Sequence, residues 1–348
     1  MRSRPTIKDI AAEVGVSHTT VSYIMNGNSS QKISDKTREA VLAAAKRLQY
    51  VPNGAARSLR SNSTHCISVA LEKSMASSRF GNLLQGIREG LHEEGYGLML
   101  FDFGSANALY PDYISSVLQR RTDGIIYVSS DGCPPPDGAL QTIVANGLPF
   151  VACDCCPEQA ELASVSFDYE RGAFEVACRL FGEGARRILY WRPSTCSPQE
   201  DYREAGIRRA VSLYPDVEFS VAQLPVETVG AAGRSERNLA YRHLCSQYLA
   251  QDIIPHITGF APGDAVICSW GVMVYLLSVS LNGKNRQLKL ASLSDIAVPI
   301  PSDSRILLSQ LDFMKGGEEC TRLLMRQLRG EGSDRILIAP SMPAYSDF

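Results

Sequence analysis

The chain has 348 residues, enough for two or three domains of roughly 100–200 residues each. Hydrophobic residues make up 45% and charged residues 21%, which excludes a chain that is disordered throughout, collagen-like or a coiled coil. The formal net charge is -2, but residues 1–65 hold ten Lys and Arg against four Asp and Glu, a net of +6, and the remainder carries 25 against 33, a net of -8. A basic N-terminal segment before an acidic remainder indicates two parts with different partners.

The sequence predicts neither a secreted protein nor a membrane-spanning one. No apolar segment of about 7–15 residues follows the first residues, and no run of about 18 apolar residues occurs. In such a chain the ten cysteines are expected to be reduced thiols. The run 153–156 contains a CxxC spacing, but it lacks the second ligand pair that is typical of a metal site. We therefore expect a cytoplasmic protein with no membrane contact, no metal and no cofactor.

Residues 6–26 predict two short helices. Thr6 and Asp9 have the spacing of a capping box, Gly15 suits the left-handed end of a helix, and Ser17 can cap the next one. Apolar residues then face inward at helical spacing: Ile7, Ile10, Ala11 and Val14 in the first helix, and Val21, Ile24 and Met25 in the second. Two helices joined by a three-residue turn with Gly predict a helix-turn-helix; a small helical hairpin of another kind is the alternative.

A third helix is expected after Ser34, and it closes a small core. Pro52 is suited to be the first residue of a short basic helix that ends near Leu59, before the polar residues 61–64. We therefore expect a helix-turn-helix domain over residues 1–50, a hinge helix and linker over 51–64, and a further part over 65–348.

Strand-like and helical segments alternate after residue 65. The strand-like segments are 67–71, 98–103, 124–128, 149–153, 163–167, 187–191, 265–269, 289–293, 306–311 and 335–339. The helical segments are 80–94, 141–146, 170–183, 201–214, 247–252, 272–282 and 316–329. Such alternation is typical of parallel sheets, and about ten strands exceed one core, so two α/β lobes are expected. The motifs GxGxxG after the first strand, GxxxxGK[ST], HExxH and GxSxG are absent, so we expect no enzyme.

Two stretches, TIKDIAAEVGVSHTTVSYIMNG and SDKTREAVLAAAKRLQYVPNGAARSLRS, resemble the DNA-binding head and hinge of the LacI/GalR family of bacterial repressors. Two later stretches, SFDYERGAFEVACRLFGEGARRILYW and YREAGIRRAV, resemble the effector domain of the same family. The resemblance implies an all-α helix-turn-helix headpiece followed by an α/β, two-lobed periplasmic-binding-protein-like domain, with parallel sheets flanked by helices.

The resemblance also implies which head residues contact DNA. Base edges would be read by His18, Thr19 and Tyr23, of which Tyr23 departs from the family's usual Arg, so the preferred half-site should differ there. Leu59 matches a leucine that is wedged into the minor groove; the alternative is a core residue of a linker helix. The remaining expected DNA contacts are Thr6, Ser17, Thr20, Ser22, Asn26, Asn53, Ala56 and Arg57.

An effector site between the lobes is implied in the same way. Arg203 matches the family's effector-binding arginine, although a surface helix arginine is the alternative, and Asp154 matches an acid that bonds sugar hydroxyls. Arg79 and Phe80 fall in the loop that is expected after the first strand. Arg79 and Trp270 depart from the family's usual residues, whereas Asp295 remains where the family usually has two acids and the first acid is lost. These departures favour an anionic or partly apolar ligand over a neutral monosaccharide; a vestigial pocket is the alternative.

Taken together, the sequence predicts a homodimeric DNA-binding transcriptional regulator, and we expect a repressor. Two heads would bind a pseudo-palindromic double-stranded operator, and a small-molecule effector would bind between the lobes. The effector would either release the DNA or promote its binding. The competing interpretation is a small-molecule binding or transport protein of the same fold, which the basic head and the missing signal disfavour.

Overall fold

The computed structural model describes residues 5–25, 32–51, 63–71, 78–101, 110–129, 132–195, 197–226, 234–281, 287–296 and 305–346. The chain divides into two compact units, Met1–Thr64 and His65–Phe348, called the head and the body below. Five residues expected to contact DNA lie outside the described residues: Asn26, Asn53, Ala56, Arg57 and Leu59.

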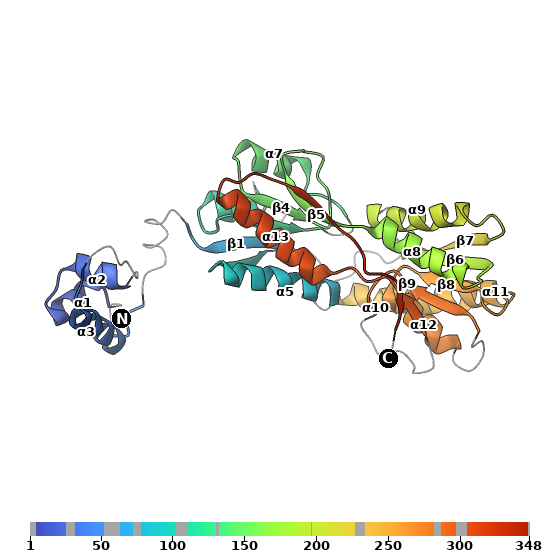
Figure 1. Ribbon diagram of the computed structural model, residues 1–348, viewed down its shortest axis with the longest axis horizontal. Helices are drawn as coiled ribbons and strands as arrows, with labels where there is room; N and C mark the ends of the chain where they lie inside the picture. The colour runs from blue at the N-terminus through green and yellow to red at the C-terminus, as the bar shows by residue number, and fades with distance from the viewer. Residues whose placement is uncertain are drawn as a thin grey trace. The chain divides into compact units, whose positions relative to one another are not determined.

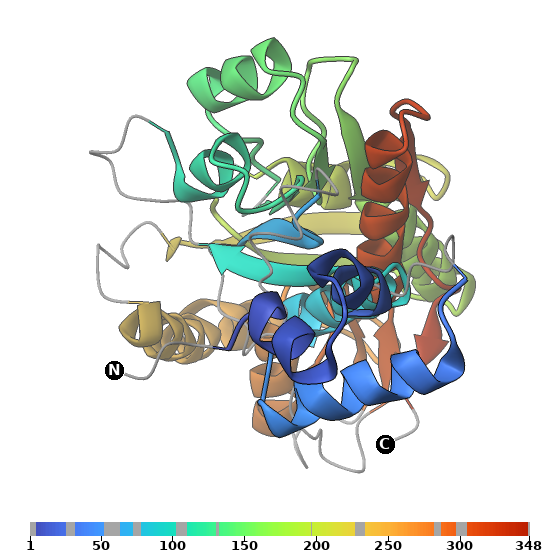
Figure 2. The same ribbon diagram turned by 90° about the vertical axis from the view of Figure 1, so that its left-hand side faces the viewer.

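The head contains three helices, α1 (Ile7–Val14), α2 (His18–Met25) and α3 (Asp35–Arg47), drawn in shades of blue in Figure 2. The predicted helix ends are confirmed: the Thr6 N–H donates to the Asp9 carboxylate at 2.7 Å, and Gly15 ends α1 with a φ of 75°. The predicted core is also confirmed, with these buried residues: Ile10, Ala11, Val21, Ile24, Val41, Ala44 and Ala45. This core buries Val21 and Ile24 of α2 and leaves His18 and Thr19 exposed.

The first lobe of the body is a parallel sheet in the order β11-β5-β4-β3-β1-β2. Its strands are β1 (Cys66–Leu71), β2 (Gly97–Phe101), β3 (Ile125–Val128), β4 (Phe150–Cys153), β5 (Ala163–Phe167) and β11 (Arg335–Ile338). Its helices are α5 (Ser78–Glu93), α6 (Asp112–Leu118), α7 (Asp137–Ala145) and α13 (Phe313–Leu328). One face packs against α5 and α13, which lie side by side (Figure 1), and the other against α6 and α7.

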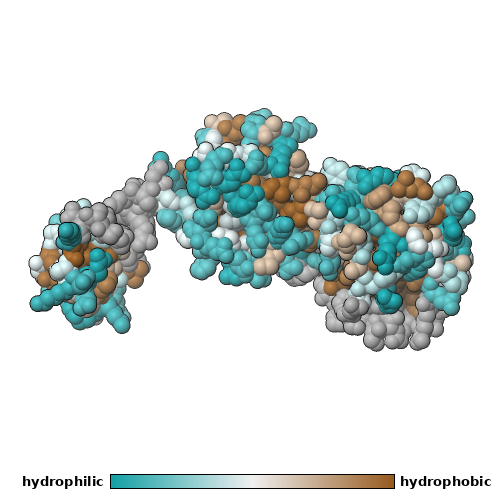
Figure 3. Space-filling view, viewed as in Figure 1, coloured by the Kyte–Doolittle hydropathy of each residue, from teal (hydrophilic) through white to brown (hydrophobic). Residues whose placement is uncertain are grey.

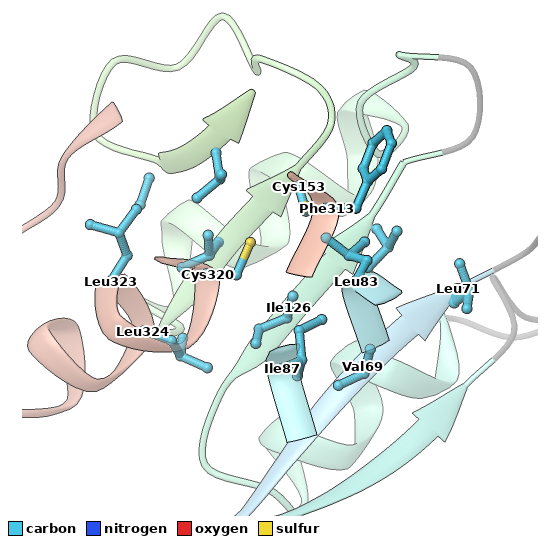
Figure 4. Close-up of a cluster of buried hydrophobic side chains, with 14 of the residues drawn as sticks. Val69, Leu71, Leu83, Ile87, Ile126, Cys153, Phe313, Cys320, Leu323 and Leu324 are labelled. Atoms are coloured by element: carbon cyan, nitrogen blue, oxygen red, sulfur yellow. The ribbon is translucent and has the colours of Figure 1, made fainter. Parts of the chain in front are cut away.

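Figure 4 shows the core between this sheet and its two long helices. Ile87 of α5 and Leu324 of α13 are fully buried and meet Ile126 of β3 there. Cys153 and Cys320 lie in the same cluster and are also fully buried. Because α13 comes from the far end of the chain, this packing ties the C-terminal part of the body to the first lobe.

The second lobe has the strand order β12-β10-β9-β8-β6-β7, parallel except for the antiparallel β10–β12 pair. Its strands are β6 (Arg187–Pro193), β7 (Glu218–Leu224), β8 (Ala265–Cys268), β9 (Lys289–Ser292), β10 (Ile306–Leu308) and β12 (Ala344–Tyr345). On one face lie α8 (Tyr169–Gly182) and α9 (Pro198–Ser212). On the other lie α10 (Arg234–Tyr248), a π-helix (Leu249–Ile253), α11 (Ile254–Ile257) and α12 (Gly271–Leu281).

The chain passes between the lobes three times: from β5 to α8, from β10 to α13, and from β11 to β12. The prediction of two parallel α/β lobes after an all-α head is confirmed. Five elements were missed or mostly missed: α6, β7, most of α10, α11 and the two-residue β12. On the face that Figure 3 shows, hydrophilic residues cover most of both lobes, and apolar residues form smaller patches.

Candidate functional site

The first candidate surface is the exposed side of α2 in the head. Ser17, His18 and Thr19 are exposed at the N-terminal end of this helix, whereas Val21 and Ile24 point into the core. The Thr20 N–H donates to Ser17 Oγ at 3.1 Å, so Ser17 caps the helix as the sequence predicts. The structure therefore brings three of the expected DNA contacts together at one helix end.

Three of the four other described residues of the expected DNA set are less accessible. Thr20, Ser22 and Tyr23 are partly buried, and the Thr20 hydroxyl lies 2.9 Å from Ser17 Oγ. Thr6 is exposed, and its hydrogen bonds lower the pKa of Asp9. An exposed polar helix end on a small unit with a net charge of +6 is suited to a polyanionic partner.

The second candidate site lies in the body, where strands of both sheets end. Asp154 directly follows β4, Ser269 directly follows β8, and Asp295 lies shortly after β9. The carboxyl ends of parallel strands meet at one edge of a sheet, which is where open α/β folds bind ligands. We call the following residues the interlobe cluster: Arg79, Asp154, Tyr169, Tyr190, Gln199, Glu200, Arg203 and Ser269.

Asp154 is the centre of one half of the interlobe cluster. Its carboxylate lies 2.9 Å from Arg79 Nη2, and it accepts hydrogen bonds from Tyr169 Oη at 2.8 Å and from Gln199 Nε2 at 2.7 Å. Burial raises the pKa of Asp154, against the charge of Arg79 and these donors. Asp154 also has a φ of 62°, a conformation that is uncommon for a residue other than Gly and that concentrates at functional sites. Because Gln199 belongs to α9, its bond joins the two lobes.

Arg203 is the centre of the other half. Its Nη1 donates to Glu200 Oε1 at 2.6 Å and to Ser269 Oγ at 3.1 Å, and its Nη2 donates to the Leu293 carbonyl at 3.1 Å. The guanidinium also lies 4.8 Å from the centre of the Tyr169 ring. Arg203 Nε is buried and has no hydrogen-bond partner among the described residues. The prediction that Arg203 lies at a site between the lobes therefore has a geometric basis, but its guanidinium is already paired.

The remaining expected effector residues lie around this cluster. Arg79 and Phe80 lie in the first turn of α5, and the expectation that they fall in a loop was wrong. Phe80 is buried in the core, and the Arg79 guanidinium lies over its ring at 4.6 Å. Trp270 is half-buried and meets the Tyr241 ring edge-on at 6.0 Å. Asp295 is half-buried, and burial raises its pKa against the charge of Arg79.

Sequence reasoning missed five members of the interlobe cluster: Tyr169, Tyr190, Gln199, Glu200 and Ser269. One signal was available for Glu200, because it precedes Arg203 by three residues in a helix, the spacing at which opposite charges pair. The other four are tied to the cluster only by tertiary contacts.

Other kinds of site find little support in the described part of the chain. No group of three or more His, Cys, Asp and Glu residues there is placed to hold a metal ion, and the cysteines described are free thiols. Burial raises the pKa of Cys245 to about 12 and that of Cys155 further still. No helix among the described residues is long and apolar enough to cross a membrane.

Two family patterns match the chain. Residues 6–53 match the bacterial regulatory proteins of the lacI family, and residues 64–244 match the periplasmic binding proteins and sugar binding domain of the LacI family. The HTH-type transcriptional repressor PurR of Vibrio campbellii is 31% identical over 211 residues. That match spans 60% of this chain and 60% of the length of the Vibrio protein.

Solved structures share the fold over nearly the whole chain. The Lac repressor dimer bound to operator and the anti-inducer ONPF is 19% identical, with a TM-score of 0.71 over 98% of each chain. A complex of the transcriptional regulator CelR with cellobiose is 21% identical, with a TM-score of 0.61 over 99% of this chain and 100% of the other. At these identities the likeness concerns the fold alone.

Proposed function

The chain belongs to the LacI family of bacterial regulatory proteins, and from that premise we propose that it is a sequence-specific DNA-binding transcriptional repressor that responds to a small-molecule effector. We propose that it acts in the cytoplasm and catalyses no reaction. The observation that carries the proposal is that one chain contains both a helix-turn-helix with an exposed polar helix end and a buried polar cluster between two lobes.

DNA recognition is assigned to α2. A recognition helix places its N-terminal residues against base edges in the major groove, and His18 and Thr19 are the exposed residues at that end. Ser17 and Thr20 are suited to phosphate contacts, which position a protein without reading sequence. Tyr23, partly buried one turn further along, would contact the base at the edge of this surface.

The operator we propose is a pseudo-palindrome that is bound by a homodimer. The chain is similar to the Lac repressor, whose solved structure is a dimer bound to its operator. It is also similar to the transcriptional repressor PurR. A two-fold symmetric dimer places one head on each half-site, so the symmetry of the protein is repeated in the DNA. The hinge, residues 51–64, would join each head to its body.

Effector binding is assigned to the interlobe cluster. The cluster contains groups from both lobes, since Asp154 of the first lobe accepts a hydrogen bond from Gln199 of the second. A ligand here would change how the lobes meet and thereby the dimer that holds the heads. Such coupling is typically about 1–3 kcal/mol and is reciprocal, so operator binding must change effector affinity by the same factor.

Selection from a pool of random duplex DNA by the full-length protein tests this function. We expect a palindromic sequence to be enriched, and no enrichment would contradict the proposal. The double variant His18→Ala/Thr19→Ala should lose the enrichment, because it removes the exposed side chains of α2 and leaves the core of the head intact. Glu39→Ala/Leu42→Ala, at exposed positions on α3, is the matched control and should select the wild-type sequence.

A further inference from the structure

A carboxylate of the protein itself lies where Arg203 would meet an anionic ligand. Glu200 Oε1 accepts from Arg203 Nη1 at 2.6 Å, and the two side chains are 5% and 4% exposed. A charge-assisted bond of this length is among the stronger hydrogen bonds in proteins. The guanidinium therefore has its counter-ion before any ligand arrives.

Glu200 is fixed in this position by two further donors. Ser269, at the end of β8, donates to the carboxylate at 2.6 to 2.7 Å, and Tyr190 Oη of β6 donates to Oε2 at 3.1 Å. All of these groups belong to the second lobe and are buried. Displacing Glu200 would strand a buried charge, which is strongly unfavourable, so a ligand must bind beside this carboxylate and not in its place.

The other arginine of the cluster is paired in the same way. Arg79 lies 2.9 Å from Asp154, whose side chain is 3% exposed, and the half-buried Asp295 adds a third carboxylate near Arg79. An incoming anion would thus meet three carboxylates and two guanidinium groups that already have partners. Only Arg203 Nε is buried and unpartnered in the described part of the cluster, and an uncharged oxygen is enough to satisfy it.

Resting on the proposed function, we propose that Glu200 determines the effector class: it occupies Arg203 as a resident anion, so the interlobe site accepts uncharged or cationic polar ligands and rejects anions. This reverses the expectation of an anionic ligand, which counted Arg79 and Arg203 without their partners. A hydroxyl, amide or carbonyl oxygen of the ligand would accept from Arg203 Nε. Trp270 follows Ser269 directly and is half-buried, with its ring edge-on to Tyr241 of α10.

Calorimetric titration of the full-length protein with inorganic phosphate and with acetate tests the proposal. The wild type should bind neither anion: the heat of titration should be no larger than with sodium chloride at equal ionic strength. Glu200→Gln keeps the side-chain volume and removes the charge, so its affinity for these anions should rise at least about tenfold through the released charge of Arg203. The double variant Glu200→Gln/Arg203→Gln should lose that gain.

Glu204→Gln is the matched control. Glu204 lies one turn further along α9 and pairs with Arg192 and Arg208, outside the interlobe cluster, so its removal should leave anion affinity at the wild-type value. A merely structural role for Glu200 would change stability without changing anion affinity. The proposal is wrong if the wild type binds phosphate through Arg203, or if Glu200→Gln gains no more than Glu204→Gln.

A second variant covers a failure of Glu200→Gln to fold. Glu200→Ala leaves a space of the size of acetate, so refolding in sodium acetate should restore the structure where equal sodium chloride does not; no recovery would contradict the proposal. None of these measurements uses DNA. If the wild-type protein binds no operator, the proposed function is wrong. The anion titrations still decide the role of Glu200 in that case.

Discussion

Tyr23 is the head residue whose replacement is most informative about base reading. It is partly buried on α2, between the core residues Val21 and Ile24 and on the same helix as the exposed His18 and Thr19. A tyrosine can donate one hydrogen bond to a base edge, whereas an arginine can bind guanine with two. The side chain at this position should therefore decide one base of the half-site.

We predict that Tyr23→Arg moves the sequence selected from random DNA toward guanine at one position of each half-site. A good bidentate contact is worth about 1–3 kcal/mol of discrimination, so the change should be plain in the selected pool. Leu42→Arg, at a position on α3 that is 48% exposed, adds the same charge away from α2 and should leave the selected sequence as it was. If Tyr23→Arg also selects the wild-type sequence, Tyr23 does not read a base.

Asp154 joins the two lobes, since its carboxylate accepts hydrogen bonds from Tyr169 of α8 and Gln199 of α9 and forms an ion pair with Arg79. We predict that Asp154→Ala lowers the Tm by roughly 6–20 °C, because breaking a buried pair costs about 3–5 kcal/mol and each kcal/mol shifts the Tm by about 2–4 °C in a domain of this size. Differential scanning calorimetry measures the shift.

Glu89→Ala is the control for Asp154→Ala. It breaks an ion pair with Arg88 on α5 whose side chains are 38% and 63% exposed, and an exposed pair is worth at most about 1 kcal/mol. Equal Tm shifts for the two variants would show that the Asp154 contacts do not stabilise the body.

At the scale of elements, α8 and α9 pack so closely that a glycine is required. A Cβ atom on Gly206 of α9 would lie 2.1 Å from the Glu170 carbonyl oxygen of α8. We predict that Gly206→Ala costs about 1–3 kcal/mol and lowers the Tm accordingly, because the helix backbones must move apart. Gly182→Ala, at the end of α8 with nothing within 4 Å, should leave the Tm unchanged or raise it slightly. Thermal melts that rank the two variants in the opposite order would contradict this packing.

The start of the second sheet depends on Asp264, just before β8. Its carboxylate accepts from the N–H groups of Ala261 and Arg187 at 2.7 and 2.9 Å and from Arg187 Nε at 3.0 Å. Burial alone would raise the pKa of Asp264, but these donors outweigh it and hold the pKa below its ordinary value of 3.8. The carboxylate thus stabilises the fold above about pH 4, and the stabilisation is lost as the pH falls through the lowered pKa.

We therefore predict that Asp264→Asn lowers the Tm at pH 7 and that the difference from the wild type shrinks as the pH falls below about 4. Asp216→Asn, at an exposed position before β7, should track the wild type at every pH. Tm measurements from about pH 2.5 to about pH 7.5 decide the matter, because a carboxylate with a lowered pKa is ionised at the upper end of this range and titrates only toward the lower end. A difference between wild type and Asp264→Asn that does not change with pH would contradict the assignment.

The success of sequence reasoning varied between elements for physical reasons. Each head helix has a capping residue and apolar residues at helical spacing, so Thr6, Gly15, Ser17 and Ser34 were enough to place the three helices. By contrast, β7 is an edge strand whose residues Glu218–Leu224 are mostly half-exposed, and an edge strand lacks the continuous apolar run of a central parallel strand. The two-residue β12 has no sequence signal of its own and is defined by its pairing with β10, Tyr345 with Leu307 and Ala344 with Leu308.

The candidate site was predictable in position but not in chemistry. Asp154 and Trp270 follow apolar strands, so their place at a sheet edge could be inferred from the sequence alone. The pairing of Arg203 with Glu200 also had a local signal, but Ser269 and Tyr190 complete it from other strands. Counting the two arginines without their partners therefore favoured an anionic ligand, an expectation that the proposed role of Glu200 reverses.

At the scale of the whole molecule, the division of charge separates two tasks. The head carries +6 and the body -8, which the total of -2 conceals. For a basic head, the logarithm of the affinity for DNA falls with the logarithm of the salt concentration, with a slope of about 0.9 for each phosphate neutralised. An acidic body, by contrast, is repelled by the duplex. This division suits a protein in which one part binds DNA and the other remains accessible to a ligand.

The most direct test of the central claim is an equilibrium titration of full-length protein against the selected palindrome, at fixed salt, followed by fluorescence anisotropy. We predict that two protomers bind each duplex and that the palindrome binds at least about 10³-fold more tightly than duplex of random sequence. Scrambling one half-site should remove most of that preference. Equal affinity for the intact palindrome and for random duplex would contradict the account.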